Sequence, residues 1–63
     1  MSNRYKGFKF SIQRIKQGFN ILIENKYEVI VMKAGPYHTF EIAFKLAIRF
    51  INENVWRIKH ENI

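Results

Sequence analysis

The sequence predicts an α+β fold in which a three-stranded antiparallel sheet packs against one C-terminal helix, in the order β-β-β-α. Residues 5–33 carry alternating apolar and polar side chains or clusters of β-branched residues, and both patterns are typical of strands. Residues 37–54 repeat apolar side chains at the spacing of one helical face and contain neither glycine nor proline. That apolar helical face needs a sheet beneath it, and the preceding strands supply one.

The chain is expected to form a single small domain, because its 63 residues lie near the lower limit for burying an adequate apolar core. Hydrophobic residues make up 48% of the sequence, which favours a folded chain over a disordered one. It contains no cysteine, so no disulfide or thiolate metal site adds stability. We therefore expect oligomerisation or a bound partner to stabilise it.

The first strand is expected within residues 5–15, after a loose arm at residues 1–4. Phe8, Phe10 and Ile12 alternate there with polar and basic residues, so the strand buries one face and exposes the other. The exposed face of this strand is consequently basic and polar.

Two further strands are expected at residues 19–24 and 27–33, joined by a hairpin with its tip at Asn25 and Lys26. The third strand contains four apolar residues in succession, so periodicity does not decide which of them face the helix. A slip of one residue in the hairpin register exchanges the two sets. The side chains that face the helix are therefore either those of Tyr27, Val29 and Val31 or those of Ile30 and Met32.

The helix is expected over residues 37–54, with a tail at residues 55–63 that either extends it or pairs as a short edge strand. Gly35 and Pro36 end the preceding apolar run, and Thr39 offers a hydroxyl to cap the first turn. The main apolar face of the helix contains Phe40, Ala43, Phe44, Ala47, Ile48 and Ile51.

The chain has more apolar surface than one helix–sheet contact needs, because Ile42, Leu46 and Phe50 lie outside the main helical face. Leu22 and one of the two third-strand sets also face away from the helix. Apolar surface in such excess favours a homodimer or another protein partner. The expected interface residues are Leu22, Val29, Val31, Ile42, Leu46 and Phe50.

The net charge is +6, and residues 1–16 carry five Lys or Arg side chains and no acidic one. A basic, strand-forming segment indicates attraction to a polyanion, with nucleic acid first and an acidic protein surface second. The alternative is that the charge serves only solubility.

The residue types argue against an enzyme. The chain has no Asp and no Cys, its five Glu are scattered, and Ser2 and Ser11 have no neighbouring base. His38 lies beside the expected helix start, where a turn or capping role is far more common than catalysis. We expect no catalytic residues, no metal and no cofactor.

No apolar run approaches the length of a membrane span, and the basic N-terminus is not followed by an apolar signal segment. The sequence therefore predicts no membrane partner and a location in a cytoplasm or nucleoid, such as that of a host cell.

Two segments resemble the AP2-type DNA-binding domain of plant regulators and related domains at the N-termini of phage and transposon integrases. The first is Tyr5-Lys6-Gly7-Phe8-Lys9, which is similar to the Tyr-Arg-Gly-Val opening of that family. The second enters the helix like the family pattern Gly-x-Phe-x-Thr-x-Glu-x-Ala, and the resemblance covers about residues 5–51. The matching positions are Gly35, Tyr37, Thr39, Glu41 and Ala43.

The resemblance implies a three-stranded sheet that lies in the major groove of DNA, with the helix behind it. Carried over by position, the strand contacts would be Lys6, Lys9, Ser11 and Lys33. The sequence departs from the family at Leu22, Glu24 and Val31, where polar or basic residues are usual.

The leading hypothesis is a small non-enzymatic protein of phage or mobile-element type that binds double-stranded DNA through the basic outer face of its sheet. The alternatives are a phage-type inhibitor or accessory protein that binds a host protein complex, and an RNA-binding protein. The expected nucleic-acid-binding residues are Arg4, Lys6, Lys9, Ser11, Gln13, Arg14, Lys16, Asn20 and Lys33.

Overall fold

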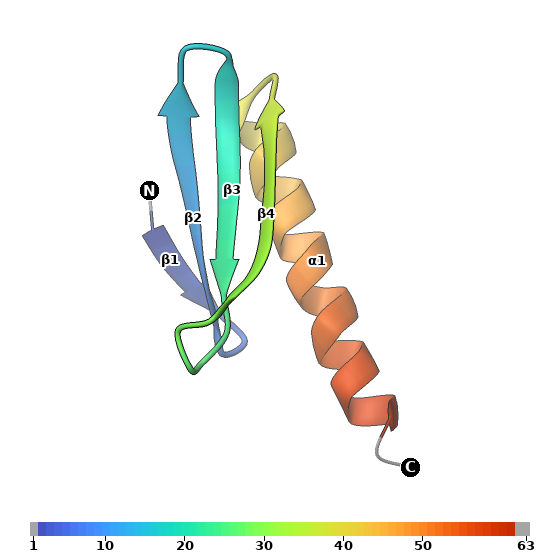
Figure 1. The fold of residues 1–63 in the computed structure, drawn as a ribbon. Helices are drawn as coiled ribbons and strands as arrows, with labels where there is room; N and C mark the ends of the chain where they lie inside the picture. The colour runs from blue at the N-terminus through green and yellow to red at the C-terminus, as the bar shows by residue number, and fades with distance from the viewer. Residues whose placement is uncertain (1, 62–63) are drawn as a thin grey trace.

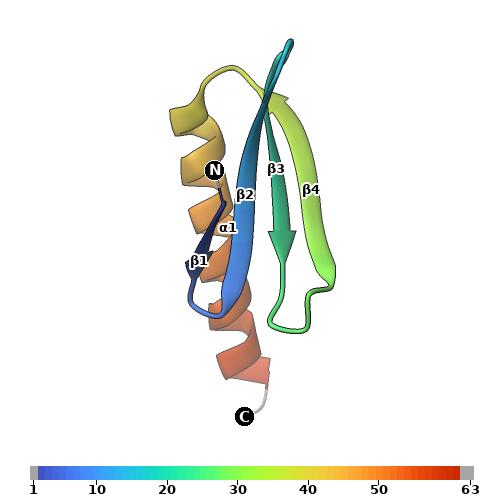
Figure 2. The ribbon, with the colours of Figure 1, turned by 90° about the vertical axis from the view of Figure 1, so that its left-hand side faces the viewer.

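The computed structural model describes residues 2–61 of the chain, and the side chains of residues 2–57. Four antiparallel strands form one sheet in the order β1-β2-β3-β4, and a long helix covers one face of it (Figures 1 and 2). The elements are β1 (Ser2–Tyr5), β2 (Phe8–Ile15), β3 (Gly18–Glu24), β4 (Ile30–Tyr37) and α1 (Phe40–Glu61).

The predicted α+β architecture with an antiparallel sheet and a C-terminal helix is confirmed, but the sheet has four strands and not three. The additional strand is β1, formed by residues that were expected to be a loose arm. Tyr5 lies opposite Phe8, and the turn between them has positive φ at both Lys6 (50°) and Gly7 (85°), which is the geometry of a tight two-residue hairpin. The residues of β1 before Tyr5 are polar and exposed, so the sequence lacks the alternation of apolar and polar residues that would predict this strand.

The core lies between α1 and the two central strands. Phe10 lies opposite Ile23, and Ile12 lies opposite Ile21, so all four side chains share the face of the sheet that α1 covers. Small side chains on α1 allow the helix to approach this face closely, because two of the three fully buried residues in its described part, Phe40 to Arg57, are alanines. The buried core consists of Phe10, Ile12, Ile21, Ile23, Ala43, Ala47 and Ile51.

Strand β4 resolves the hairpin register that the sequence left open. Met32 lies opposite Ile23 and packs against the core, whereas Ile30 lies opposite Glu24 after a register shift between the two pairs. Neither alternative set therefore enters the core as a whole. The strand also continues through Gly35 and Pro36, which were expected to end it. Proline is tolerated there because β4 is an edge strand.

The predicted roles of Asn25 at the hairpin and of Thr39 at the start of the helix are confirmed. The hairpin loop is longer than expected, however: it extends through Val29, so residues 27–29 are not part of the strand, which begins at Ile30. The Asn25 side-chain oxygen accepts hydrogen bonds from the backbone N–H groups of Tyr27 (2.8 Å) and Val29 (3.1 Å), which fixes the tip of the β3–β4 hairpin. The Thr39 hydroxyl accepts a hydrogen bond from the Ile42 N–H (3.2 Å) and caps α1.

Helix α1 continues through the expected tail to Glu61, so the helical alternative for this segment is the correct one; residues 62 and 63 lie outside the described part of the chain. Within the described residues, α1 lacks the combination of length and apolar character that crossing a membrane requires.

Replacing Ala47 by leucine should destabilise the fold by about 1–3 kcal/mol, because Ala47 is fully buried where the helix meets the sheet and extra methylenes overfill that contact. Urea unfolding followed by circular dichroism measures the change. Lys45→Leu is the matched control, since Lys45 is exposed on the same helix and its substitution should change stability by no more than about 0.5 kcal/mol. Equal effects of the two changes would contradict the proposed close packing.

Candidate nucleic-acid interface

The face of the sheet opposite α1 carries most of the predicted nucleic-acid contacts. We call it the open face. Residues directly opposite each other in antiparallel strands share a face, so the register fixes its members. It presents three rows across the strands: Arg4, Lys9, Glu24 and Ile30; Ser2, Ser11, Leu22 and Lys33; and Gln13 and Asn20.

The centre of the open face is a shallow hollow of about 300 Å³ between β2, β3 and β4. Gln13 and Asn20 supply amide donors and acceptors to its lining, Lys33 supplies an ammonium group, and Leu22 supplies an apolar floor. These side chains could form hydrogen bonds with base edges or phosphates, since amides serve both and ammonium groups favour anions.

Gly35 also lines this hollow, although the sequence indicated only that it ends a strand and matches the family pattern at the helix entry. Its φ is +125°, and a Cβ atom at this position would lie only 2.6 Å from the side-chain oxygen of Asn20. Glycine therefore allows β4 to pass close to Asn20. The signal for this role is the strand pairing of residues 30–37, which the sequence alone does not reveal.

The open face is positively charged, although less strongly than the composition of residues 1–16 predicts. Arg4, Lys9 and Lys33 contribute three cations, and Glu24 contributes one carboxylate directly opposite Lys9. Arg4, Lys9 and Lys33 are exposed, whereas Glu24 is half-buried. A polyanion would thus meet cations on β1, β2 and β4 and one acidic group on β3.

Three of the nine predicted contact residues do not lie on the open face. Lys6 is in the β1–β2 turn, where its Nζ donates a hydrogen bond to the Asn52 side-chain oxygen on the helix (2.9 Å). Arg14 lies opposite Phe19 on the helix side of the sheet, and Lys16 lies in the β2–β3 turn. The six that the open face brings together are Arg4, Lys9, Ser11, Gln13, Asn20 and Lys33.

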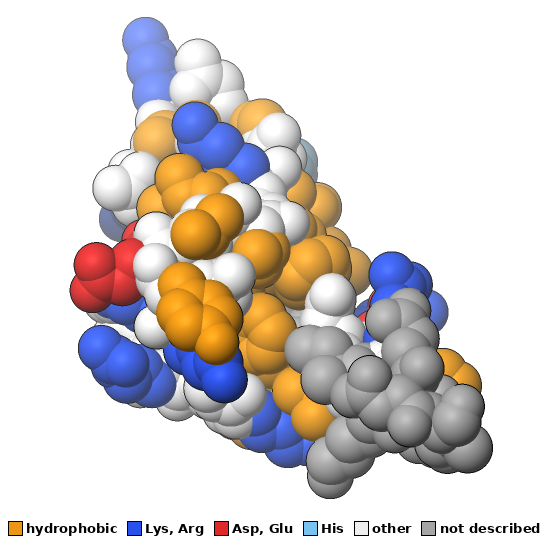
Figure 3. Space-filling view, turned by 60° about the horizontal axis from the view of Figure 1, so that its bottom comes forward, with side chains coloured by type: hydrophobic (Ala, Val, Ile, Leu, Met, Phe, Trp, Pro, Cys, Tyr) orange, Lys and Arg blue, Asp and Glu red, His pale blue; other side chains and the backbone are white. Residues whose placement is uncertain are grey.

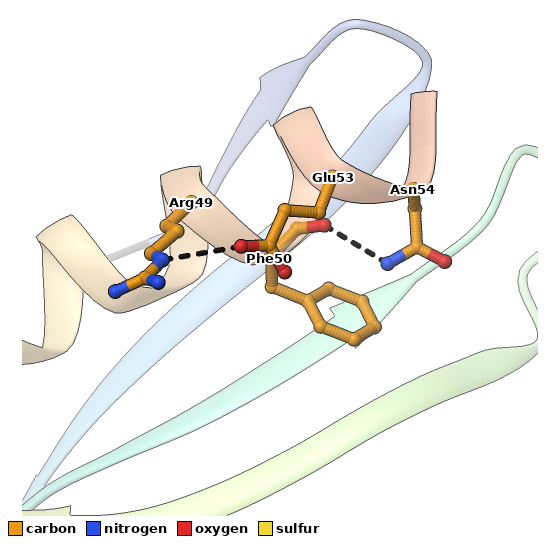
Figure 4. Close-up of polar contacts among 4 residues, drawn as sticks. All are labelled: Arg49, Phe50, Glu53 and Asn54. Carbon is orange, nitrogen blue, oxygen red and sulfur yellow. Dashed lines mark hydrogen bonds and ion pairs between the residues drawn. The ribbon is translucent and has the colours of Figure 1, made fainter. Parts of the chain in front are cut away.

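The outer surface of α1 offers no comparable basic stripe among its described side chains. Lys45 pairs with Glu41 (2.9 Å), and Arg49 pairs with Glu53 (3.1 Å; Figure 4). Both pairs are exposed and span one helical turn, so each contributes little stability, but together they balance charge along this surface. The sheet is therefore the better electrostatic target for a polyanion.

The six predicted protein-interface residues fall into three groups. Leu22 is half-buried on the open face, Val29 and Val31 are exposed on or beside β4, and Ile42 is exposed on α1. Leu46 and Phe50 are partly buried on α1 and pack against the core.

Within the described residues, the structure gathers no group of three His, Cys, Asp or Glu side chains that could hold a metal ion. His38 is exposed beside the helix cap.

No family model matches the sequence, and no curated protein or solved structure matches it either.

Gly35→Ala should destabilise the protein by at least about 2 kcal/mol, because it combines a strained positive φ with a clash against Asn20. Gly7→Ala is the matched control: Gly7 also has a positive φ, but an added Cβ would meet no atom within 4 Å. We expect about 1 kcal/mol of destabilisation there from backbone strain alone. Chemical unfolding of both variants tests the difference, and a smaller effect at Gly35 would contradict the close approach of β4 to Asn20.

Proposed function

We propose that this chain is a small, non-enzymatic DNA-binding protein of phage or mobile-element type, and that it binds duplex DNA through the open face. The observation that carries the proposal is the juxtaposition of six polar or basic side chains on a sheet face that α1 leaves uncovered. The resemblance to AP2-type and integrase N-terminal domains supports the same orientation, with the sheet toward DNA and the helix behind it.

The dimensions of the central strands fit a major groove. Neighbouring strands lie ~4.8 Å apart, so β2 and β3 with their side chains form a ribbon that a groove ~12 Å wide admits. The Gln13 and Asn20 amides, opposite each other at the centre of this ribbon, have the donor and acceptor pair that recognises adenine. Arg4 and Lys33 lie on the outer strands, where phosphates would flank the ribbon.

Two of the three residues that depart from the family pattern, Leu22 and Glu24, lie on the open face and have defined consequences in this arrangement. Leu22 forms the apolar floor between Ser11 and Lys33, where it could contact a thymine methyl group. Glu24 is paired with Lys9 across the strands, and its carboxylate would repel a nearby phosphate. Recognition would then depend on few base contacts and more strongly on shape and phosphate charge.

Lys9→Ala should weaken binding to all DNA sequences and lower the slope of log K against log salt by about one unit, as expected for one lost phosphate contact. Fluorescence anisotropy with a random duplex of about 20 base pairs, titrated at several salt concentrations, measures both quantities. Lys45→Ala is the matched control, because it removes the same charge from the far side of the molecule. An equal change in both variants would indicate that only net charge matters, and absence of binding by the natural chain at low salt would remove the proposal. A preference for duplex RNA would favour the RNA-binding alternative.

Glu24→Gln should tighten DNA binding by roughly twofold to tenfold at low salt, and the gain should shrink as salt rises. The change removes a carboxylate of the open face while keeping its size and its acceptor oxygen. Glu53→Gln is the control on the outer surface of α1, where the effect should be smaller. The same anisotropy assay decides, and weaker binding by Glu24→Gln would place this carboxylate in a favourable contact instead.

A further inference from the structure

A second hollow lies outside the open face, at the end of the sheet where β2 turns into β3. It has a volume of about 570 Å³, and it is shallow and open to solvent. Figure 1 shows this turn and the connection from β4 to α1 at the same end of the molecule. We call it the turn hollow: it is lined by residues 14–19, which contain the turn, and by His38 from the connection to α1.

Strand pairing brings His38 to this turn, although the two are far apart in the sequence. Phe19 lies opposite Tyr37 in the β3–β4 ladder. Gly18 makes this approach possible, because a Cβ atom there would clash with the backbone carbonyl oxygen of Tyr37. On the other side of His38, the Phe40 ring lies 6.1 Å from the Phe19 ring. His38 is therefore held at the turn by anchored residues on both sides of it.

The turn hollow is cationic. Arg14 and Lys16 supply two positive charges, and none of the described residues that line the hollow is acidic. Neither cation forms an ion pair with another residue of the part whose side chains are described, whereas Lys45 on α1 pairs with Glu41 (2.9 Å). Glu41 is the acidic residue nearest to His38 in the sequence, and this pairing engages it one helical turn farther along α1. The two cations of the hollow are thus left to attract an anion.

The donors that line the turn hollow suit an oxyanion. Arg14 offers a planar guanidinium, Lys16 an ammonium group, Gln17 an amide and His38 an imidazole N–H. In Figure 3 this end of the sheet lies at the top and recedes from the viewer, and Lys and Arg side chains appear there, whereas Asp and Glu side chains appear only lower in the view. A phosphate group, with several acceptor oxygens and a negative charge, matches this set of donors.

The position of the turn hollow favours a phosphate of the DNA that occupies the open face. Gln13 and Asn20 end the open face directly beside Arg14 and Phe19, where the turn hollow begins. Strand β2 has eight residues and is ~26 Å long, so it must lie along a major groove that is only ~12 Å wide. That groove winds around the duplex every ~34 Å. Because the groove curves away from a straight ribbon, the end of the ribbon approaches the phosphate backbone.

We propose that the turn hollow binds a phosphate group of the DNA backbone, next to the duplex segment on the open face. The inference rests on the proposed function and extends its interface. Arg14 forms paired hydrogen bonds with two phosphate oxygens, Lys16 adds a point charge, and Gln17 and His38 donate single hydrogen bonds. Since Arg14 lies on the helix side of the sheet, the bound backbone passes around the end of the β2–β3 ribbon.

Arg14→Gln and Lys16→Gln should each weaken binding to a random duplex of about 20 base pairs and lower the slope of log K against log salt by about one unit. Fluorescence anisotropy at several salt concentrations measures both quantities, and circular dichroism checks that each variant is folded. Arg57→Gln is the matched control, because it removes an arginine charge from an exposed position toward the far end of α1. It should change the slope by much less, and an equal change would overturn the proposal.

Comparison with Lys9→Ala separates this inference from the proposed function. If the slope falls for Lys9→Ala but not for Arg14→Gln and Lys16→Gln, the open face binds DNA and the phosphate site in the turn hollow is overturned. If it falls only for the two variants of the turn hollow, the phosphate site is supported and the open face is not the duplex-binding surface. Absence of duplex binding by the natural chain at low salt would overturn both.

Nuclear magnetic resonance of the isotope-labelled natural chain, titrated with the same duplex, gives a second readout that involves no variant. The amide signals of Gln17 and His38 should shift with the same midpoint as those of Gln13 and Asn20, because one DNA molecule contacts both surfaces. Signals of the turn hollow that stay unchanged when the open face is saturated would overturn the proposal.

Discussion

The close contact between α1 and the two central strands is the constraint on which the other features depend. Ala43 and Ala47 bring the helix against Phe10 and Ile23, and residues 2–61 contain no second helix to cover the opposite side. A single helix ~10 Å wide cannot cover a four-stranded sheet from edge to edge. The open face and the β4 edge are therefore both left uncovered, because one helix is too narrow to cover them.

These two uncovered surfaces differ in chemistry, and the difference suggests different partners. The open face combines amides and cations, as in Gln13, Asn20 and Lys33, so it retains favourable interactions with water when unbound. Val29 and Val31, on or beside β4, have no polar groups in their side chains and gain most from being removed from water. Charge attracts a polyanion to the first, and apolar area favours a protein on the second.

The helix and strands could be predicted where burial of one face produces a regular spacing of apolar residues. They could not be predicted where only hydrogen bonding between strands determines the structure. The core positions of β2 and α1 followed from alternation at Phe10 and Ile12 and from helical spacing at Ala43. Strand β1 has no apolar period, and the register shift near Ile30 arises from pairing with Glu24, so neither could be predicted from composition.

The open face shows the same division. Alternation places Lys9 and Gln13 away from the core, and the same rule applied further assigns Arg14 to the helix side with Phe10. The role of Gly35 depends on a contact between β3 and β4 that residue spacing does not encode. The side of the sheet on which each residue of a strand lies was thus predictable, whereas the contacts between strands were not.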